Sequence, residues 1–152
     1  MSINPYQDIE SASGFQIYEF YSVGKETLKK RVRFDLVDSL EQIYNLALCT
    51  VSPDGEEDCE NASRNGDMDR VLETVAQIAI IYTNRYPERK IFFRGSDIVR
   101  TRKYQIGIVK YLDFAAKDFD IEGVTISEQN EIITREAFRR GENYNGFIFI
   151  RK

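Results

Sequence analysis

The sequence has no histidine and no tryptophan, and its only cysteines are Cys49 and Cys59. The absence of histidine excludes Ser-His-Asp and Cys-His catalysis and every metal site with an imidazole ligand. Two cysteines are too few for an all-thiolate zinc site within one chain. An enzyme with this composition would have to use carboxylates, Lys, Tyr, Ser or Arg, and no pattern in the chain predicts a cofactor or a metal.

Long hydrophobic runs are also missing. The longest, AQIAIIY at residues 76–82, is far too short to span a bilayer. The first residues, MSINPYQDIESASG, lack the apolar segment of a secretory signal. The two cysteines do not form a CxxC pair, and without a signal they suggest reduced thiols. Together these absences predict a cytoplasmic protein that does not associate with membranes.

The length and composition are those of one folded domain. The chain has 152 residues, of which 42% are hydrophobic, and this is enough for one core. The net charge of −4 excludes a general polyanion binder, so nucleic-acid binding would need a local basic patch. We expect a flexible leader over residues 1–13 and a single α+β domain over residues 14–152.

Alternation of polar and apolar residues predicts the strands. The clearest case is one half-buried strand with two opposite rows: Leu28, Val32, Phe34 and Leu36 on one face, and Lys29, Arg31, Arg33 and Asp35 on the other. Lys30 interrupts the apolar row. Other strands are predicted at residues 15–21, 43–51, 90–95, 119–126 and 146–152. Residues 127–146 are polar and give no clear prediction.

Two helices are predicted between these strands. Asn65-Gly66-Asp67 is typical of a helix start, with Asp67 as the N-cap of a helix from Met68 to Tyr86. Ser96 or Asp97 can cap a second helix that extends to about Lys117. The order β-β-β-α-β-α-β-β predicts an α+β fold. Its sheet is expected to be mostly antiparallel, with five to six strands and two long helices packed on one face.

Three stretches carry a resemblance to a known family: NGDMDRVLETVA (65–76), FRGSDIVRTRKYQIGI (93–108) and the ending NYNGFIFIRK. With them the chain resembles a family of small uncharacterised proteins found mainly in Bacteroidetes-type bacteria. The family pattern is an Asn-Gly-Asp helix start, Gly-Ser followed by Arg-Thr-Arg-x-Tyr, and a short aromatic C-terminal strand. The resemblance covers most of the chain and implies no activity. The family's usual Gly-Ser-Thr is Gly95-Ser96-Asp97 here, and the added carboxylate weakens an anion-binding role at that helix start.

The segment FFRGSDIVRTRKYQ (92–105) contains the strongest candidate site. A strand-to-helix corner at a glycine offers backbone N–H groups, and nearby arginines could clamp a phosphate or carboxylate. This candidate anion-binding corner consists of Arg94, Gly95, Ser96, Arg100, Arg102, Lys103 and Tyr104. The alternative is structural: Ser96 and Asp97 cap the helix, and Arg100 pairs with a local acid.

The outward basic row is a second candidate. Lys29, Arg31 and Arg33 could combine with Tyr18 and Phe20 from the adjacent strand. Open sheets that carry basic and aromatic side chains bind single-stranded nucleic acid in several folds. A solvated strand face explains the row equally well, because Lys and Arg on strands also discourage edge pairing.

Two weaker candidates involve self-association and catalysis. Ile80 and Ile81 lie near the polar side of the first helix and could form a homodimer surface. Arg100 and Tyr104 with nearby acids would suit a phosphoryl-transfer or nuclease-like enzyme, although Tyr104 falls on the predicted core side. We favour a non-enzymatic binding or regulatory module whose basic corner meets an anionic ligand or protein partner, because it requires only surface charge.

Overall fold

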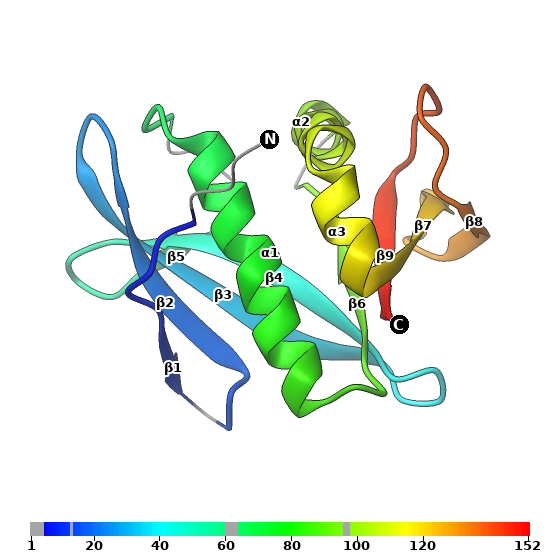
Figure 1. Cartoon of the computed structure of the whole chain (residues 1–152), viewed down its shortest axis with the longest axis horizontal. Helices are drawn as coiled ribbons and strands as arrows, with labels where there is room; N and C mark the ends of the chain where they lie inside the picture. The colour runs from blue at the N-terminus through cyan, green and yellow to red at the C-terminus, as the bar shows by residue number, and fades with distance from the viewer. Residues whose placement is uncertain (1–4, 13, 60–63, 96–97) are drawn as a thin grey trace. The chain divides into compact units, whose positions relative to one another are not determined.

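A computed structural model describes residues 5–12, 14–59, 64–95 and 98–152 (Figure 1). The chain divides into two compact units. Unit 1 comprises Met1–Asp35 and Leu46–Pro87, and unit 2 comprises Leu36–Asn45 and Glu88–Lys152. The prediction of a single domain over residues 14–152 stays a prediction. Ser96 and Asp97, the predicted caps of the second helix, lie outside the described residues.

Unit 1 is built on an antiparallel hairpin under a long helix. Its elements are β1 (Glu10–Ala12), β2 (Ile17–Val23), most of β3 (Thr27–Asp38), the second part of β4 (Ile43–Val51), β5 (Glu57–Asp58) and α1 (Met68–Arg85). β2 pairs with β1 on one side and with β3 on the other, and β5 pairs with β4, all antiparallel. Figure 1 shows α1 lying across this hairpin.

The β2–β3 register decides which side chains α1 covers. Tyr18 pairs with Val32 and Phe20 pairs with Lys30. Cross-strand partners share a face of the sheet, so all four belong to the buried face. The ring of Phe34, also on β3, stacks on Tyr82 of α1 with centroids 3.7 Å apart. Val32 and Phe34 of the predicted apolar row therefore belong to the core of unit 1, whereas the prediction is wrong for Leu36, which is 55% exposed.

The N-terminal segment contributes to this core through Tyr6. The side chain of Tyr6 is buried and stacks against Phe20 with ring centroids 5.8 Å apart. Its hydroxyl donates to Asp67 Oδ2 at 2.5 Å and accepts from the backbone N–H of Val23 at 2.8 Å. Asp67 stands at the N-cap position of α1, as predicted, but makes no side-chain capping bond to the helix. Its carboxylate binds Tyr6 and Ser22 instead.

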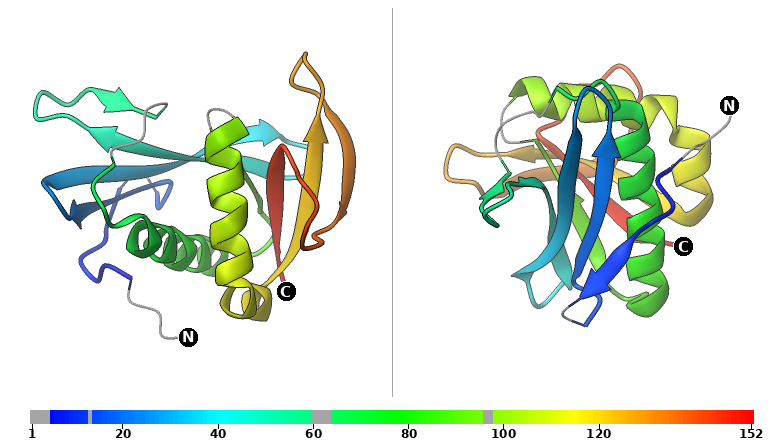
Figure 2. Two further views of the ribbon diagram at one scale, coloured as in Figure 1. Left: turned by 90° about the horizontal axis from the view of Figure 1, so that it is seen from above. Right: turned by 90° about the vertical axis from the view of Figure 1, so that its left-hand side faces the viewer.

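Unit 2 places three strand ends at one edge of its sheet. Its elements are the end of β3, the start of β4, β6 (Lys90–Phe93), α2 (Ile98–Lys110), α3 (Leu112–Asp118), β7 (Phe119–Ile126), β8 (Ile132–Ala137) and β9 (Gly146–Arg151). β6 pairs in parallel with β4 and antiparallel with β9, which pairs antiparallel with β7. β8 pairs with β7, and α2 runs beside β9 and β7 (Figure 2). The end of β6, the end of β7 and the start of β9 therefore meet.

The structure corrects the predicted fold class. The described part of the chain is mostly β, with nine strands in one mixed sheet of order β1-β2-β3-β4-β6-β9-β7-β8 and β5 paired with β4. The prediction of five to six mostly antiparallel strands under two long helices is wrong. Three short strands were missed, β4 and β6 pair in parallel, and the second helix is divided into α2 and α3 near the buried Tyr111. Short polar edge strands leave little hydrophobic signal in a sequence.

Two buried tyrosines in unit 1 should differ in how the loss of their hydroxyl group changes the free energy of unfolding. The hydroxyl of Tyr18 is buried and makes no hydrogen bond within the described part of the chain. Burial raises the pKa of Tyr18 to about 12, with smaller contributions from the neighbouring Tyr82 and Tyr86. We expect Tyr18→Phe to leave the free energy of unfolding unchanged or slightly higher, whereas Tyr6→Phe should lower it by about 1–2 kcal/mol. Urea denaturation of both variants checks this, and a larger loss for Tyr18→Phe would contradict it.

Candidate functional site

A polar cavity of about 440 Å³ lies at the edge of unit 2 where the three strand ends meet. Its lining comes from the end of β6, the first turns of α2, the turn between β7 and β8, and the loop before β9. The lining residues are Arg94, Gly95, Thr101, Arg102, Ile126, Ser127, Asn130, Asn143, Tyr144 and Asn145. The cavity therefore collects residues from two regions of the sequence that are about 30 positions apart.

Two arginines give this cavity a positive charge. Arg94 follows β6 and Arg102 lies in α2, and both side chains are exposed. Neither makes an ion pair or hydrogen bond with any residue that the structure describes, and no Asp or Glu is among the described residues of the lining. Arg135, elsewhere in unit 2, contrasts with them because its guanidinium contacts Glu122 at 2.7 Å and Glu41 at 2.8 Å. Arg94 and Arg102 thus keep their hydrogen-bond donors available.

Three asparagines add neutral donors and acceptors to the lining. Asn130 has a φ of 63°, a left-handed conformation that asparagine tolerates, and its N–H closes the β7–β8 turn by donating to the carbonyl of Ser127. Asn145 is fixed because its Oδ1 accepts the N–H of Ile126 at 2.8 Å. The side chains of Asn130 and Asn143 make no bond to other described residues. Their amides can therefore bind a ligand hydroxyl or oxyanion.

Tyr144 holds the loop that carries two of these asparagines. Its ring packs against the backbone at Gly123, where any Cβ would collide with the ring. The Tyr144 hydroxyl donates to Glu136 Oε1 at 3.0 Å and accepts the N–H of Arg139 at 3.2 Å. On the other side, the Gln105 amide donates to the carbonyl of Glu142. These contacts fix the wall of the cavity to β7, β8 and α2.

Gly95 serves packing in the predicted corner. Its backbone N–H donates to Thr101 Oγ1 at 3.2 Å, so this group is already used within the protein. A Cβ at Gly95 would lie 2.6 Å from the backbone nitrogen of Thr101 and still closer to Arg100. Glycine is needed here because the end of β6 approaches the first turn of α2 closely. The Gly95 N–H is consequently not available to a ligand.

The structure brings together only part of the predicted corner. Arg94, Gly95 and Arg102 line the cavity, whereas Arg100 and Lys103 do not. Tyr104 is 7% exposed and stacks on Phe93 with ring centroids 4.7 Å apart, as a core residue. Ser96 lies outside the described residues. The three asparagines were not predicted as site residues, and they fall within the polar segment 127–146 that gave no strand prediction.

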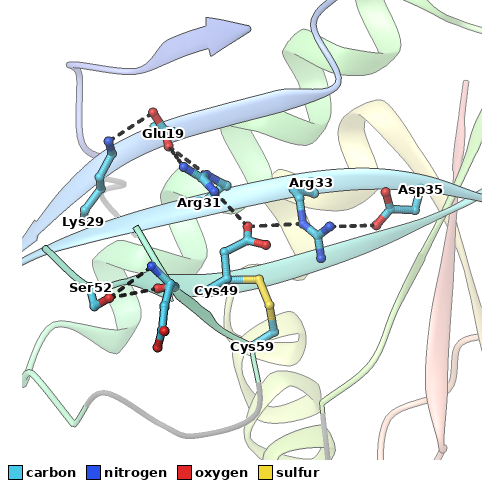
Figure 3. A network of polar contacts seen from close by, with 10 residues as sticks. Glu19, Lys29, Arg31, Arg33, Asp35, Cys49, Ser52 and Cys59 are labelled. Atoms are coloured by element: carbon cyan, nitrogen blue, oxygen red, sulfur yellow. Dashed lines mark hydrogen bonds and ion pairs between the residues drawn. A yellow bond between two sulfur atoms is a disulfide. The ribbon is translucent and has the colours of Figure 1, made fainter. Parts of the chain in front are cut away.

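The basic row of β3 lies on the exposed face of unit 1 and is paired with acids (Figure 3). Arg31 contacts Glu19 at 2.7 Å and Glu57 at 3.2 Å. The remaining pairs are Lys29 with Glu19 at 3.4 Å, Arg33 with Glu57 at 3.3 Å and Arg33 with Asp35 at 3.8 Å. Each cation of the row therefore has an acidic partner.

The aromatic part of the predicted nucleic-acid surface needs correction. Tyr18 and Phe20 are each 1% exposed and lie on the face opposite to the basic row, because they pair with Val32 and Lys30. They cannot stack on a base without unfolding the core. The aromatic residue that does share the basic face is Tyr21, which pairs with Lys29 and is 55% exposed.

The predicted self-association surface is small. Ile80 and Ile81 are half-buried in α1, so neither presents a fully exposed apolar side chain. The exposed apolar residues of unit 2 include Val99 and Ile106 on α2. Homodimer formation through Ile80 and Ile81 stays a prediction.

The two cysteines are joined in the structure. Cys49 on β4 and Cys59 after β5 form a disulfide with Cα atoms 4.0 Å apart (Figure 3). The expectation of reduced thiols is therefore wrong for this structure. Cysteines ten positions apart gave no recognisable spacing signal, and the short strand β5 that brings them opposite each other was not predicted.

The chain belongs to a family of unknown function. Residues 2–152 match the family described as "Family of unknown function (DUF6934)". This confirms the predicted membership of such a family, while the bacterial group and the family motif stay predictions. No curated protein and no solved structure matches the chain. Within the described residues, no helix is both long and apolar enough to cross a membrane.

Glu19 should make the stability of unit 1 depend on pH. Burial alone would raise the pKa of Glu19, but hydrogen bonds and charge from Arg31 and Lys29 outweigh it and hold the pKa below the usual 4.5. A lower pKa in the folded state means that Glu19 stabilises the fold fully above about pH 4.5, and that this contribution is lost as the pH falls through the folded-state pKa. Glu19→Gln should therefore make the Tm fall less steeply between roughly pH 5 and pH 3.

Thermal unfolding followed by circular dichroism checks this expectation. The matched control is Glu128→Gln, because Glu128 is exposed and has no ion pair with a described residue. The control should follow the wild-type curve. Parallel plots of Tm against pH for wild type and Glu19→Gln would contradict the role of Glu19 in the pH dependence of stability.

Proposed function

We propose that the protein is a non-enzymatic binding module that holds a small anionic ligand in the cavity of unit 2. The observation that carries this proposal is the pair Arg94 and Arg102, which share a cavity whose described lining residues include no carboxylate. Both side chains are exposed and, unlike Arg31 and Arg135, contact no carboxylate among the described residues. Their guanidinium groups are therefore free to donate charge-assisted hydrogen bonds to an anionic ligand.

The size and lining of the cavity favour a small molecule with an oxyanion group. A volume of about 440 Å³ is within the range of ligand pockets. Guanidinium groups bind phosphate and carboxylate oxygens in a bidentate manner, and this adds orientation to charge. Amides from Asn130, Asn143 and Asn145 could then bind hydroxyl groups or the remaining oxygens. A phosphorylated or carboxylated polyol has this combination of groups.

The state of the lining hydroxyls supports binding rather than catalysis. Thr101 accepts the N–H of Gly95, Ser127 Oγ accepts the N–H of Glu131, and Tyr144 is bonded to Glu136. These hydroxyls maintain the shape of the cavity. The charged residues of the described lining are arginines, whose guanidinium groups position an anion by donating hydrogen bonds to it.

Phosphate titration of two neighbouring variants tests the proposal. Arg102→Ala removes a guanidinium from the cavity, and Lys103→Ala removes an equal charge from an exposed residue of the same helix that does not line it. We expect Arg102→Ala to weaken the binding of inorganic phosphate by roughly tenfold, since a charged hydrogen bond is lost. Lys103→Ala should stay within about twofold of wild type.

Isothermal titration calorimetry at low ionic strength is the measurement. Ribose 5-phosphate serves as a second probe, because hydroxyl groups should add affinity through the asparagines. Equal weakening by both variants would indicate general surface attraction and would contradict a site in the cavity. Absence of phosphate binding by the wild-type protein would contradict it as well.

A further inference from the structure

In unit 1, the disulfide between Cys49 and Cys59 holds the acidic strand β5 beside the basic residues of β3. β5 pairs with β4 through only two residue pairs, Thr50 with Asp58 and Val51 with Glu57. The next opposing pair in this register is Cys49 and Cys59, and these residues form the disulfide. The covalent bond thus continues a very short ladder.

The strand that this bond retains carries the acid that covers the basic row. Glu57 of β5 contacts two cations of that row: its Oε2 lies 3.2 Å from Arg31 Nη1 and 3.3 Å from Arg33 Nε. The turn before β5 adds further negative charge through Asp54 and Glu56. Figure 3 shows Arg31 and Arg33 directed toward the disulfide-bonded segment. The carboxylates of this loop therefore offset positive charge of the basic row on β3.

A hollow between the loop and β3 brings an aromatic residue into the same place. Its volume is about 750 Å³, and its lining includes Tyr21, Lys29 and Arg31 on one side and residues of the 50–58 hairpin on the other. Tyr21 is exposed and lies beside Lys29 in the β2–β3 register. Basic side chains with an exposed aromatic ring are the groups that bind single-stranded nucleic acid on a sheet.

We propose that Lys29, Arg31, Arg33 and Tyr21, here called the basic strip, form a single-stranded nucleic-acid site that the disulfide keeps covered and that reduction uncovers. The reductant is a dithiol. One of its thiolates attacks the sulfur of Cys59, which is less buried than Cys49, breaks the S–S bond and releases Cys49 as a thiolate that takes up a proton. The second thiol of the reductant then releases Cys59, so two electrons and two protons pass to the protein and the dithiol becomes a disulfide.

Besides the disulfide, β5 is held by its two residue pairs with β4, by the turn hydrogen bonds between Ser52 and Glu56, and by the ion pairs of Glu57. A two-stranded hairpin is only marginally stable by itself, and partly exposed ion pairs contribute little, so we expect loss of the covalent bond to let β5 leave β4. When β5 leaves, Arg31 and Lys29 keep Glu19, and Arg33 keeps only the 3.8 Å contact with Asp35. The strip therefore gains net positive charge and loses the loop that excludes a ligand.

The test measures binding of a fluorescein-labelled 20-mer of deoxythymidine by fluorescence anisotropy at roughly 20 mM salt. We expect the protein reduced with dithiothreitol to bind at least tenfold more tightly than the oxidised protein, with affinity that falls as salt rises. Cys59→Ser should bind like the reduced protein without any reductant. The half-buried Cys59 is chosen for substitution in preference to Cys49, which is 1% exposed and belongs to the core.

Charge reversal locates the site. Arg31→Glu with Arg33→Glu should abolish the binding gained on reduction. The matched control, Arg139→Glu with Arg140→Glu, changes the net charge equally at exposed positions in unit 2 and should retain that binding. Circular dichroism of each variant establishes that it is folded.

Three results would overturn the proposal. The first is equal affinity of the oxidised and reduced proteins, or no binding by either. The second is Cys59→Ser binding like the oxidised wild type. The third is an equal loss of affinity in the two charge-reversed variants, which would indicate attraction to the whole surface in place of the basic strip.

Discussion

The alternation of side chains along β3 is the constraint on which unit 1 depends. Because successive residues point to opposite faces, the register that places Phe34 on Tyr82 of α1 also places Arg31 and Arg33 on the exposed face. A shift of one residue would bury guanidinium groups under the helix, at a cost no ion pair would offset. The aromatic core and the charged face are therefore two consequences of one register.

Five arginines of this chain show two different electrostatic environments that the net charge conceals. Arg31, Arg33 and Arg135 each contact at least one carboxylate, so their charge is balanced within the protein. Arg94 and Arg102 have no such partner among the described residues and share one cavity. A chain with a net charge of −4 can still present a positive site if its acids lie elsewhere.

Elements with a strong hydrophobic period could be predicted from the sequence, and short polar elements could not. The first helix was predicted from Met68 to Tyr86 and is found at Met68–Arg85, because Asn65-Gly66-Asp67 and Pro87 mark its ends. β5 and β8 were not predicted. Glu57–Asp58 and the largely exposed Ile132–Ala137 have no buried face, so their sequences show no alternation of polar and apolar residues. The parallel pairing of β4 with β6 depends on contacts between distant residues, which local periodicity does not encode.

Only the part of the candidate site whose residues are close in sequence could be predicted. Arg94, Gly95 and Arg102 are close in sequence, so a strand-to-helix corner brings them together locally. The asparagines lie close to these three residues only because β9 lies between β6 and β7 and runs antiparallel to both. This order places the start of β9 beside the ends of the other two strands, and Asn145 is held there by the N–H of Ile126. A reader of the sequence could have found the asparagines only by first knowing that order. Strand order, more than any motif, therefore creates the cavity.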